Sequence, residues 1–157
     1  MTALFWNLVL AAVWALATGE LGPAGLAKGF ALGYLALWLC RPLLPDSGYF
    51  RKSFEFVRFA LFFLWELLLA NLRVAYDVVT PKVHMRPSIL AIPLEARTDE
   101  EITLLAGLIT LTPGTLSIEV SADRRTLFIH AMFVDDADEF RRELKDGFER
   151  RLLEVLR

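Results

Sequence analysis

The first part of the chain alternates between long apolar runs and short breaks rich in glycine and proline. Leu4 to Thr18 is apolar throughout and predicts a helix. After a cluster of glycine and proline, Leu26 to Cys40 forms a second apolar run that ends at Arg41-Pro42. Together they predict a tight transmembrane helical hairpin over residues 1–41. The first run, about 22 Å long, is short against a hydrocarbon core of roughly 30 Å.

The next long segment predicts a single amphipathic helix. After a loop over residues 42–50, Arg51 to Val79 contains neither glycine nor proline before Thr80-Pro81. At 100° per residue, its charged side chains fall within a stripe about 120° wide, and the opposite face is apolar. This charged stripe holds Arg51, Lys52, Glu55, Arg58, Glu66, Arg73 and Asp77. We therefore predict a long membrane or interfacial helix over residues 51–80.

Glu66 is the main candidate functional residue, because it is the only charged residue between Arg58 and Arg73. A charge at membrane depth costs about 2.5 to 3.5 kcal/mol and often marks function. Three interpretations are open: a proton or cation relay, a structural or inter-subunit ion pair, and simple solvation if the helix lies in the interface. Asn71, Arg58, Arg73 and Asp77 are candidates for packing against other subunits.

Beyond a connector at residues 81–87, residues 88–157 predict a small two-layer α/β domain. Residues 88–94 favour an edge strand, because Pro93 cannot donate a ladder hydrogen bond. Thr98 and Glu101 have the spacing of a capping box, which opens a helix that runs through Ile109. Strands follow at 116–120 and 126–134, and apolar residues at steps of four and three predict a last helix over 136–156. The predicted order is β-α-β-β-α.

Composition and charge separate the same two halves. The 157 residues carry a formal net charge of −2. Residues 1–87 hold 8 Lys/Arg and 5 Asp/Glu, a net +3, whereas residues 88–157 hold 9 and 14, a net −5. An acidic domain argues against nucleic-acid binding, because it repels phosphate. The single cysteine, Cys40, excludes an internal disulfide and a cysteine-based metal cluster.

Charge does not settle the topology. The basic loop with Arg41, Arg51 and Lys52 is expected in the cytoplasm. If the third helix crosses the bilayer, the acidic domain lies outside; if the helix lies along the surface, the domain is cytoplasmic. The alternative of a cleaved signal peptide, suggested by Ala15-Leu16-Ala17, is disfavoured because no basic segment precedes the apolar run.

No arrangement of side chains typical of catalysis is recognisable. His130 shares a strand face with Thr126, Phe128 and Met132, and without a second ligand at chelating spacing it is best interpreted as structural. The hydroxyl residues at 110–117 lack the glycine-rich loop and lysine of a phosphate-binding loop. The acidic run at 135–139 suits a helix N-terminus. We therefore predict no enzyme and no catalytic, cofactor or metal site.

Two stretches are similar to a known family. The segment Leu64–Ala75 (LWELLLANLRVA) and the segment Leu108–Ile118 (LITLTPGTLSI), which continues into Leu127–Met132 (LFIHAM), resemble the E-type subunit of the Mrp-type multisubunit sodium/proton antiporters. The resemblance extends over essentially the whole chain. It implies a hetero-oligomeric membrane complex in which proton influx drives cation export through larger subunits, with this chain as an accessory member needed for assembly or full activity.

The resemblance also implies a cytoplasmic C-terminal domain. We therefore expect a multi-pass protein of the bacterial cell membrane with a cytoplasmic N-terminus and an interfacial third helix. Its partners would be the lipid bilayer and the other antiporter subunits. An alternative from another class is a membrane-anchored adaptor whose α/β domain binds a soluble partner or a regulatory ligand.

Overall fold

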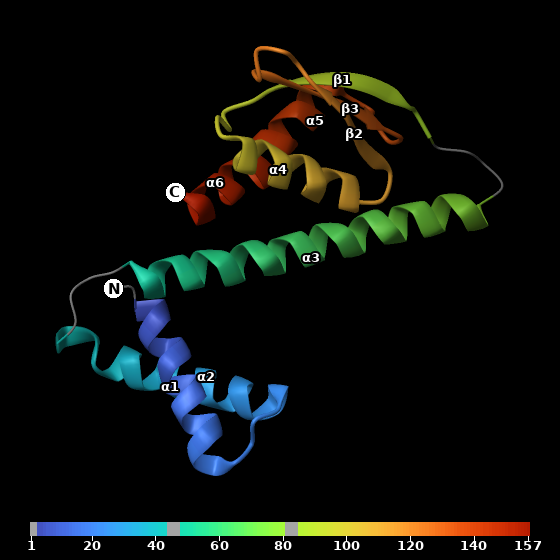
Figure 1. Cartoon of the computed structure of the whole chain (residues 1–157). Coiled ribbons are helices and arrows are strands. Elements are labelled where there is room, and N and C mark those ends of the chain that lie inside the picture. The colour runs from blue at the N-terminus through green and yellow to red at the C-terminus, as the bar shows by residue number, and fades with distance from the viewer. Residues whose placement is uncertain (1–2, 44–47, 81–84) are drawn as a thin grey trace. The chain divides into compact units, whose positions relative to one another are not determined.

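The computed structural model describes residues 3–43, 48–80 and 85–157. The chain divides into two compact units, Met1–Phe54 and Glu55–Arg157. The first holds a helical hairpin, and the second holds a sheet with its helices (Figure 1). The boundary lies inside the long helix α3 (Tyr49–Val79), because most turns of this helix belong to the second unit. The sequence pattern alone places the division after the connector at residue 87.

The first unit contains α1 (Ala3–Thr18), α2 (Pro23–Leu39) and the short 3-10 helix η1 (Arg41–Leu43). Both predicted helices form. Helix α2 begins three residues earlier than Leu26, since Pro23 occupies its first turn, where a missing N–H costs no helical hydrogen bond. Gly19, with a φ of +73°, reverses the chain between the two helices.

Small residues bring α1 and α2 close together. The buried residues of the hairpin recur every four positions: Asn7, Ala11 and Ala15 on α1, and Gly25, Gly29, Gly33 and Leu37 on α2. A Cβ atom at Gly29 would lie 2.7 Å from the carbonyl oxygen of Ala11. Any larger residue there would separate the helices, so the glycines set the packing distance.

A buried polar contact ties the start of α3 to the hairpin. Asn7 is fully buried, and its side-chain amide donates a hydrogen bond of 2.9 Å to the hydroxyl of Tyr49. The ring of Tyr49 packs against Tyr34 and Phe50, with centroid distances of 5.7 and 5.2 Å. The first turn of α3 therefore belongs to the hairpin unit.

The transmembrane part of the predicted hairpin is not confirmed. Helices α1 and α2 contain 16 and 17 residues, which corresponds to about 24 to 26 Å against a hydrocarbon core of roughly 30 Å. Among the described residues, none of the helices combines the length and the hydropathy that crossing a bilayer requires.

The second unit contains a three-stranded antiparallel sheet in the order β1-β3-β2. Its strands are β1 (Ser88–Pro93), β2 (Thr115–Val120) and β3 (Thr126–Ala131). Helix α4 (Asp99–Leu111) opens with the predicted capping box of Thr98 and Glu101. Gly114, with a φ of +88°, forms the turn into β2, because glycine adopts a positive φ without steric strain. The helices cover one face of the sheet (Figure 1), so the expected α/β order is present.

The last helix is not the continuous α-helix that the sequence pattern predicts. It consists of α5 (Ala137–Glu143), the π-helical segment η2 (Leu144–Glu149) and α6 (Arg150–Leu156). The apolar residues of this region mostly recur at steps of four, which is more than the 3.6 residues of an α-helical turn. A wider π turn keeps them on the face that packs against the core.

Strand β2 buries its polar face. Apolar and polar residues alternate along this strand, a pattern that would normally place the apolar face in the core. In the strand register, Ser117 lies opposite the buried Ile129 of β3 and therefore on the covered face. Leu116 and Ile118 lie on the outer face, where each is about half exposed. The hydroxyl of Ser117 donates to the carbonyl of Ala106 in α4, and this bond holds β2 in that orientation.

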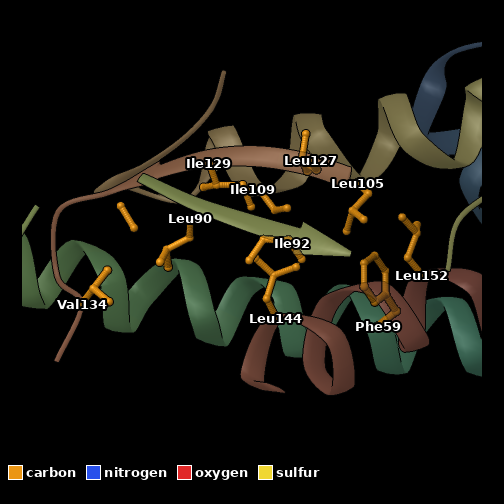
Figure 2. Packing of buried hydrophobic residues seen from close by; sticks show 11 residues of the cluster. Phe59, Leu90, Ile92, Leu105, Ile109, Leu127, Ile129, Val134, Leu144 and Leu152 are labelled. Carbon is orange, nitrogen blue, oxygen red and sulfur yellow. The ribbon is translucent and has the colours of Figure 1, made fainter. Parts of the chain in front are cut away.

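The core of the second unit lies between the sheet and the helices (Figure 2). Strands β1 and β3 contribute Leu90, Ile92, Leu127 and Ile129, each at most 5% exposed. Phe59 of α3 belongs to the same cluster. Core members and packed neighbours on α3 and the last helical region include Phe59, Phe62, Phe140, Leu144, Phe148 and Leu152. The long helix is therefore part of the domain core.

Candidate functional site

The charged stripe of α3 faces the α/β domain of the same chain. Phe62 of α3 lies 5.4 Å from Phe148 of η2, centroid to centroid, and the guanidinium of Arg151 lies over the Phe62 ring at 4.1 Å. Gly147 permits this approach, because a Cβ there would already lie 3.3 Å from Phe62. The α/β domain thus covers the charged stripe of α3. From the sequence alone, this stripe was expected to face other subunits or water.

A large cleft runs along this boundary, and we call it the α3 cleft. Its volume is about 1060 Å³. Glu66, Arg73 and Asp77 line it from α3. The opposite wall is formed by the turn at residues 112–115, the loop at 133–136, helix α5 and segment η2. Three of the five candidate residues from the sequence therefore meet in one place.

These three residues have different surroundings. Glu66 is half-buried and forms no ion pair with a described residue. The guanidinium of Arg73 lies over the ring of Phe133 at 6.0 Å, which is within reach of a cation–π contact. Asp77 is 7% exposed. Of the two candidate carboxylates that line the cleft, Glu66 is thus the one that forms no ion pair with a described residue.

The other two candidates lie away from the cleft. Arg58 pairs with Glu154 of α6 at 3.5 Å, on the surface. Asn71 is exposed, and its side-chain amide donates to the carbonyl of Leu67 one turn earlier on the same helix. Neither residue lines the α3 cleft, so neither forms a site with Glu66.

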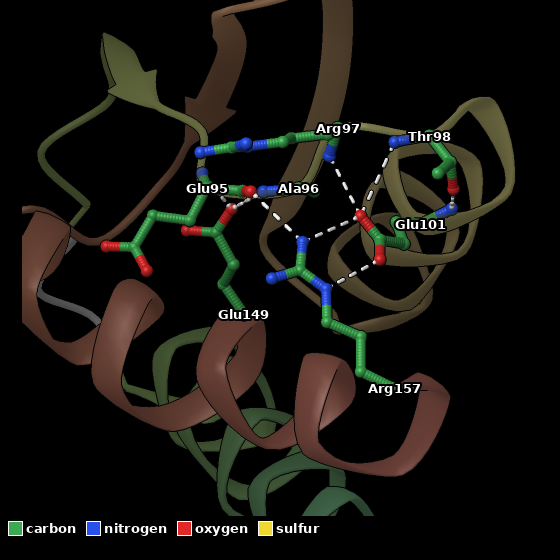
Figure 3. A network of polar contacts seen from close by, with 7 residues as sticks. All are labelled: Glu95, Ala96, Arg97, Thr98, Glu101, Glu149 and Arg157. Atoms are coloured by element: carbon green, nitrogen blue, oxygen red, sulfur yellow. Dashed lines mark hydrogen bonds and ion pairs between the residues drawn. The ribbon is translucent and has the colours of Figure 1, made fainter.

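A second polar cluster joins the start of α4 to the last helix (Figure 3). The sequence pattern predicts only the part of this cluster that caps α4. The carboxylate of Glu101 accepts hydrogen bonds from the backbone of Arg97 and Thr98 and from the guanidinium of Arg157. The hydrogen bond from Arg157, followed by those from the backbone, lowers the pKa of Glu101 to about 2. Hydrogen bonds to the charged form stabilise it.

Glu149 of η2 belongs to the same region. It is 1% exposed, and its carboxylate accepts hydrogen bonds from the backbone N–H groups of Glu95 and Ala96 at 2.6 and 2.9 Å. The π turn places this carboxylate beneath the loop between β1 and α4. Only the cap of Thr98 and Glu101 has a local sequence signal; the contacts of Glu149 and Arg157 bridge more than fifty residues, so no local spacing reveals them.

The remaining sequence candidates have structural surroundings. Thr115 donates to the carbonyl groups of Ile109 and Thr112, and Asp136 caps α5 by accepting from the backbone of Asp138 and Glu139. Thr115 thus stabilises the turn before β2, and Asp136 has the helix-start role predicted for the acidic run. His130 is half-buried on the outer face of the sheet, and His84 lies outside the described residues.

The comparison with known proteins covers nearly the entire chain. The family model for a Na⁺/H⁺ ion antiporter subunit matches residues 7–155. The chain is 38% identical to the E-type Na⁺/H⁺ antiporter subunit of Bacillus subtilis (strain 168), over 96% of both chains. It is 37% identical to the E-type subunit of Alkalihalophilus pseudofirmus, over 95% of this chain and 94% of that protein. The chain belongs to the Na⁺/H⁺ ion antiporter subunit family, and within it to the E type.

Two solved structures share the fold. A chain in the Mrp complex from Dietzia sp. DQ12-45-1b is 29% identical with a TM-score of 0.51, over 65% of this chain and 96% of that one. A chain in the membrane-bound sulfane sulfur reductase, an archaeal respiratory membrane complex, is 28% identical with a TM-score of 0.57, over 96% of both. The expected family and its multisubunit setting are therefore confirmed.

Proposed function

We propose that this chain is an accessory subunit that supports assembly of a Na⁺/H⁺ antiporter and does not itself carry the ions. The main observation is that two of the cations on α3 contact groups of the same chain. Arg58 pairs with Glu154, and Arg73 lies over Phe133. A related chain in a respiratory membrane complex has the same fold, which also favours a shared structural role over a role in one ion pathway.

The exposed face of α3 supports a position along the membrane surface. Leu61, Leu64, Trp65 and Leu68 are each between 49% and 63% exposed, on the side away from the α/β domain. An amphipathic helix of 31 residues can bury such a face at the boundary of headgroups and acyl chains. We propose that α3 lies on the cytoplasmic surface of the membrane, that the hairpin inserts into the bilayer, and that the basic loop and the C-terminal domain are in the cytoplasm.

We further propose that Glu66 forms an inter-subunit ion pair. A half-buried carboxylate such as Glu66, which pairs with none of the residues that the structure describes, costs free energy unless a cation of another subunit compensates it. A relay would need further titratable groups in hydrogen-bond contact with Glu66, and no such contact exists among the described residues. Asn71, on another side of α3, would contact a different neighbour.

Deletion of the gene tests the accessory role. We expect cells without this chain to lose sodium tolerance at alkaline pH and to contain less of the assembled complex, as measured by growth and by native gel electrophoresis of membranes. Unchanged tolerance together with intact assembly of the other subunits would contradict the proposal.

The variant Glu66→Gln separates an ion pair from a relay. If Glu66 forms an inter-subunit pair, we expect less assembled complex but normal exchange per complex that remains, measured in vesicles with a pH-sensitive dye. The matched control is Asn71→Ala, which removes a polar group on another side of α3. Normal assembly with slow exchange would instead identify Glu66 as a relay.

One observation favours the adaptor as a second candidate function. The outer face of the sheet exposes Ile89, Leu116 and Ile118 around His130. An apolar sheet face of this kind often contacts another protein. If the chain is an adaptor, Ile89→Ser should abolish binding of a soluble protein to the full-length chain while the antiporter complex still assembles.

A further inference from the structure

The two ends of the hairpin unit differ in charge. At the turn between α1 and α2, the amine of Lys28 lies 2.9 Å from the carboxylate of Glu20, so the charges there are paired. At the other end, α2 is followed by η1 and by the start of α3. Residues 40–54, which we call the basic end, carry three cations and one carboxylate, a net charge of +2: Arg41, Arg51, Lys52 and Asp46.

Two arginines of the basic end are exposed and have no partner among the described residues. Arg41 follows α2, and Arg51 lies in the first turn of α3. Neither forms an ion pair with a described residue, although Glu55 lies one turn after Arg51. By contrast, the next cation along α3, Arg58, pairs with Glu154 at 3.5 Å. The positive charge of Arg41 and Arg51 is therefore left to a ligand outside the described residues.

Exposed aromatic and apolar side chains lie at the same end of the unit. Trp6, near the start of α1, and Trp38, near the end of α2, are each about half exposed. At 100° per residue, Arg51 is about 40° from the exposed Trp65 around α3, so it lies at the border of the apolar face. Tryptophan and arginine side chains side by side with exposed apolar surface are typical of the boundary between membrane and water.

We propose that Arg41 and Arg51 bind the phosphate groups of anionic phospholipids, whose acyl chains cover the apolar surface beside them. This inference rests on the proposed function, which places the hairpin in the bilayer and α3 on its surface. Anionic lipid matches both observations, because one molecule supplies a negative charge and an apolar chain next to it. Lysine and arginine near an anionic membrane surface are attracted to it, and the paired charges of Lys28 and Glu20 give the other end no such preference.

Tryptophan quenching by brominated lipids tests the choice of lipid. The full-length chain is reconstituted in phosphatidylcholine vesicles that contain a minor fraction of brominated lipid, either phosphatidylglycerol, which is anionic, or phosphatidylcholine. Trp6 and Trp38 lie at the proposed site and report on the lipids around it. We expect brominated phosphatidylglycerol to quench more strongly than brominated phosphatidylcholine at the same content, and added salt to reduce the difference.

Removal of charge tests the two residues. We expect Arg41→Gln and Arg51→Gln each to lower the preference for phosphatidylglycerol by about fivefold. Arg41→Lys and Arg51→Lys should retain most of it, because the positive charge is kept. The matched control is Arg125→Gln, which removes an exposed arginine of the α/β domain and should leave the preference unchanged. An equal loss in this control would overturn the inference, and circular dichroism confirms that each variant is folded.

The remaining outcomes are distinguishable. Inorganic phosphate should reduce the quenching by phosphatidylglycerol no more than chloride does at the same ionic strength; a stronger effect would assign the arginines to a free anion and contradict the proposal. If both brominated lipids quench equally, the arginines do not select anionic lipid, although the hairpin still lies in the bilayer. If neither lipid quenches, the proposed membrane position itself is wrong.

Discussion

The ion pair of Glu101 and Arg157 shows how a local signal is completed by a distant residue. The spacing of Thr98 and Glu101 predicts the cap, because a capping box involves neighbours in the sequence. The guanidinium of Arg157 approaches the same carboxylate at 2.9 Å from the end of α6. Sequence reasoning finds the first contact and misses the second, since the second depends on how two helices pack.

This pair makes stability depend on acid pH. The pKa of Glu101 is lowered from 4.5 to about 2 by hydrogen bonds to its charged form, so its stabilising contribution is present above pH 4.5 and is lost as the pH falls toward 2. We expect Glu101→Gln to lower the free energy of unfolding by about 1 to 2 kcal/mol at pH 7. The difference should narrow below pH 4.5 in urea unfolding experiments. The effect of Arg157→Gln should have the same pH dependence; an effect of either variant that is independent of pH would contradict this explanation.

Two glycines provide a matched test of the hairpin packing. A Cβ atom at Gly29 would meet the backbone of Ala11, whereas one at Gly107, on α4, would meet nothing within 4 Å. We expect Gly107→Ala to stabilise the protein by about 0.5 to 1 kcal/mol. Gly29→Ala should destabilise the hairpin, and thermal unfolding in detergent followed by tryptophan fluorescence measures both. A stabilising Gly29→Ala would mean that α1 and α2 do not pack through this glycine.

Among the elements, the long helix α3 is the one that the sequence predicts best. The contacts that cover this helix are what the sequence predicts least. Its charged stripe follows from periodicity alone, and the helix forms from Tyr49 to Val79. What covers the stripe depends on contacts such as Phe62 with Phe148, 86 residues apart in sequence order, and no local pattern contains that information. Strand β2 shows the same limit, because its alternation is clear but its buried face is the one with Ser117.

The two faces of α3 should respond differently to substitution. Phe59 is 8% exposed in the domain core, and Leu64 is 58% exposed on the apolar face. We expect Phe59→Ala to destabilise the second unit by about 3 to 5 kcal/mol. Leu64→Glu should leave stability within about 0.5 kcal/mol but should reduce the amount of chain that sediments with anionic vesicles. Equal sedimentation of Leu64→Glu and wild type would argue against an interfacial position of α3.

At the scale of the whole molecule, the structure shifts the domain boundary. Composition changes at residue 87, because the charge balance reverses there. The compact units instead meet between Phe54 and Glu55, since Phe59 and Phe62 complete the core of the α/β domain. A composition boundary marks where the surroundings of the chain change, whereas a folding boundary marks where buried contacts end.

Two fragments test this boundary directly. We expect a fragment of residues 55–157 to unfold cooperatively in urea, because it retains the contacts of Phe59 and Phe62 with the core. A fragment of residues 88–157 lacks both rings and exposes the apolar surface that they cover. Loss of two large core side chains costs several kcal/mol, typically about 3 to 5 for each phenylalanine, against a total stability of about 5 to 15 kcal/mol. The shorter fragment should therefore be partly unfolded without urea and should bind a hydrophobic dye, with mild detergent present in both samples. Equal unfolding midpoints for the two fragments would show that the α/β domain folds without α3 and that the boundary at residue 87 is the physical one.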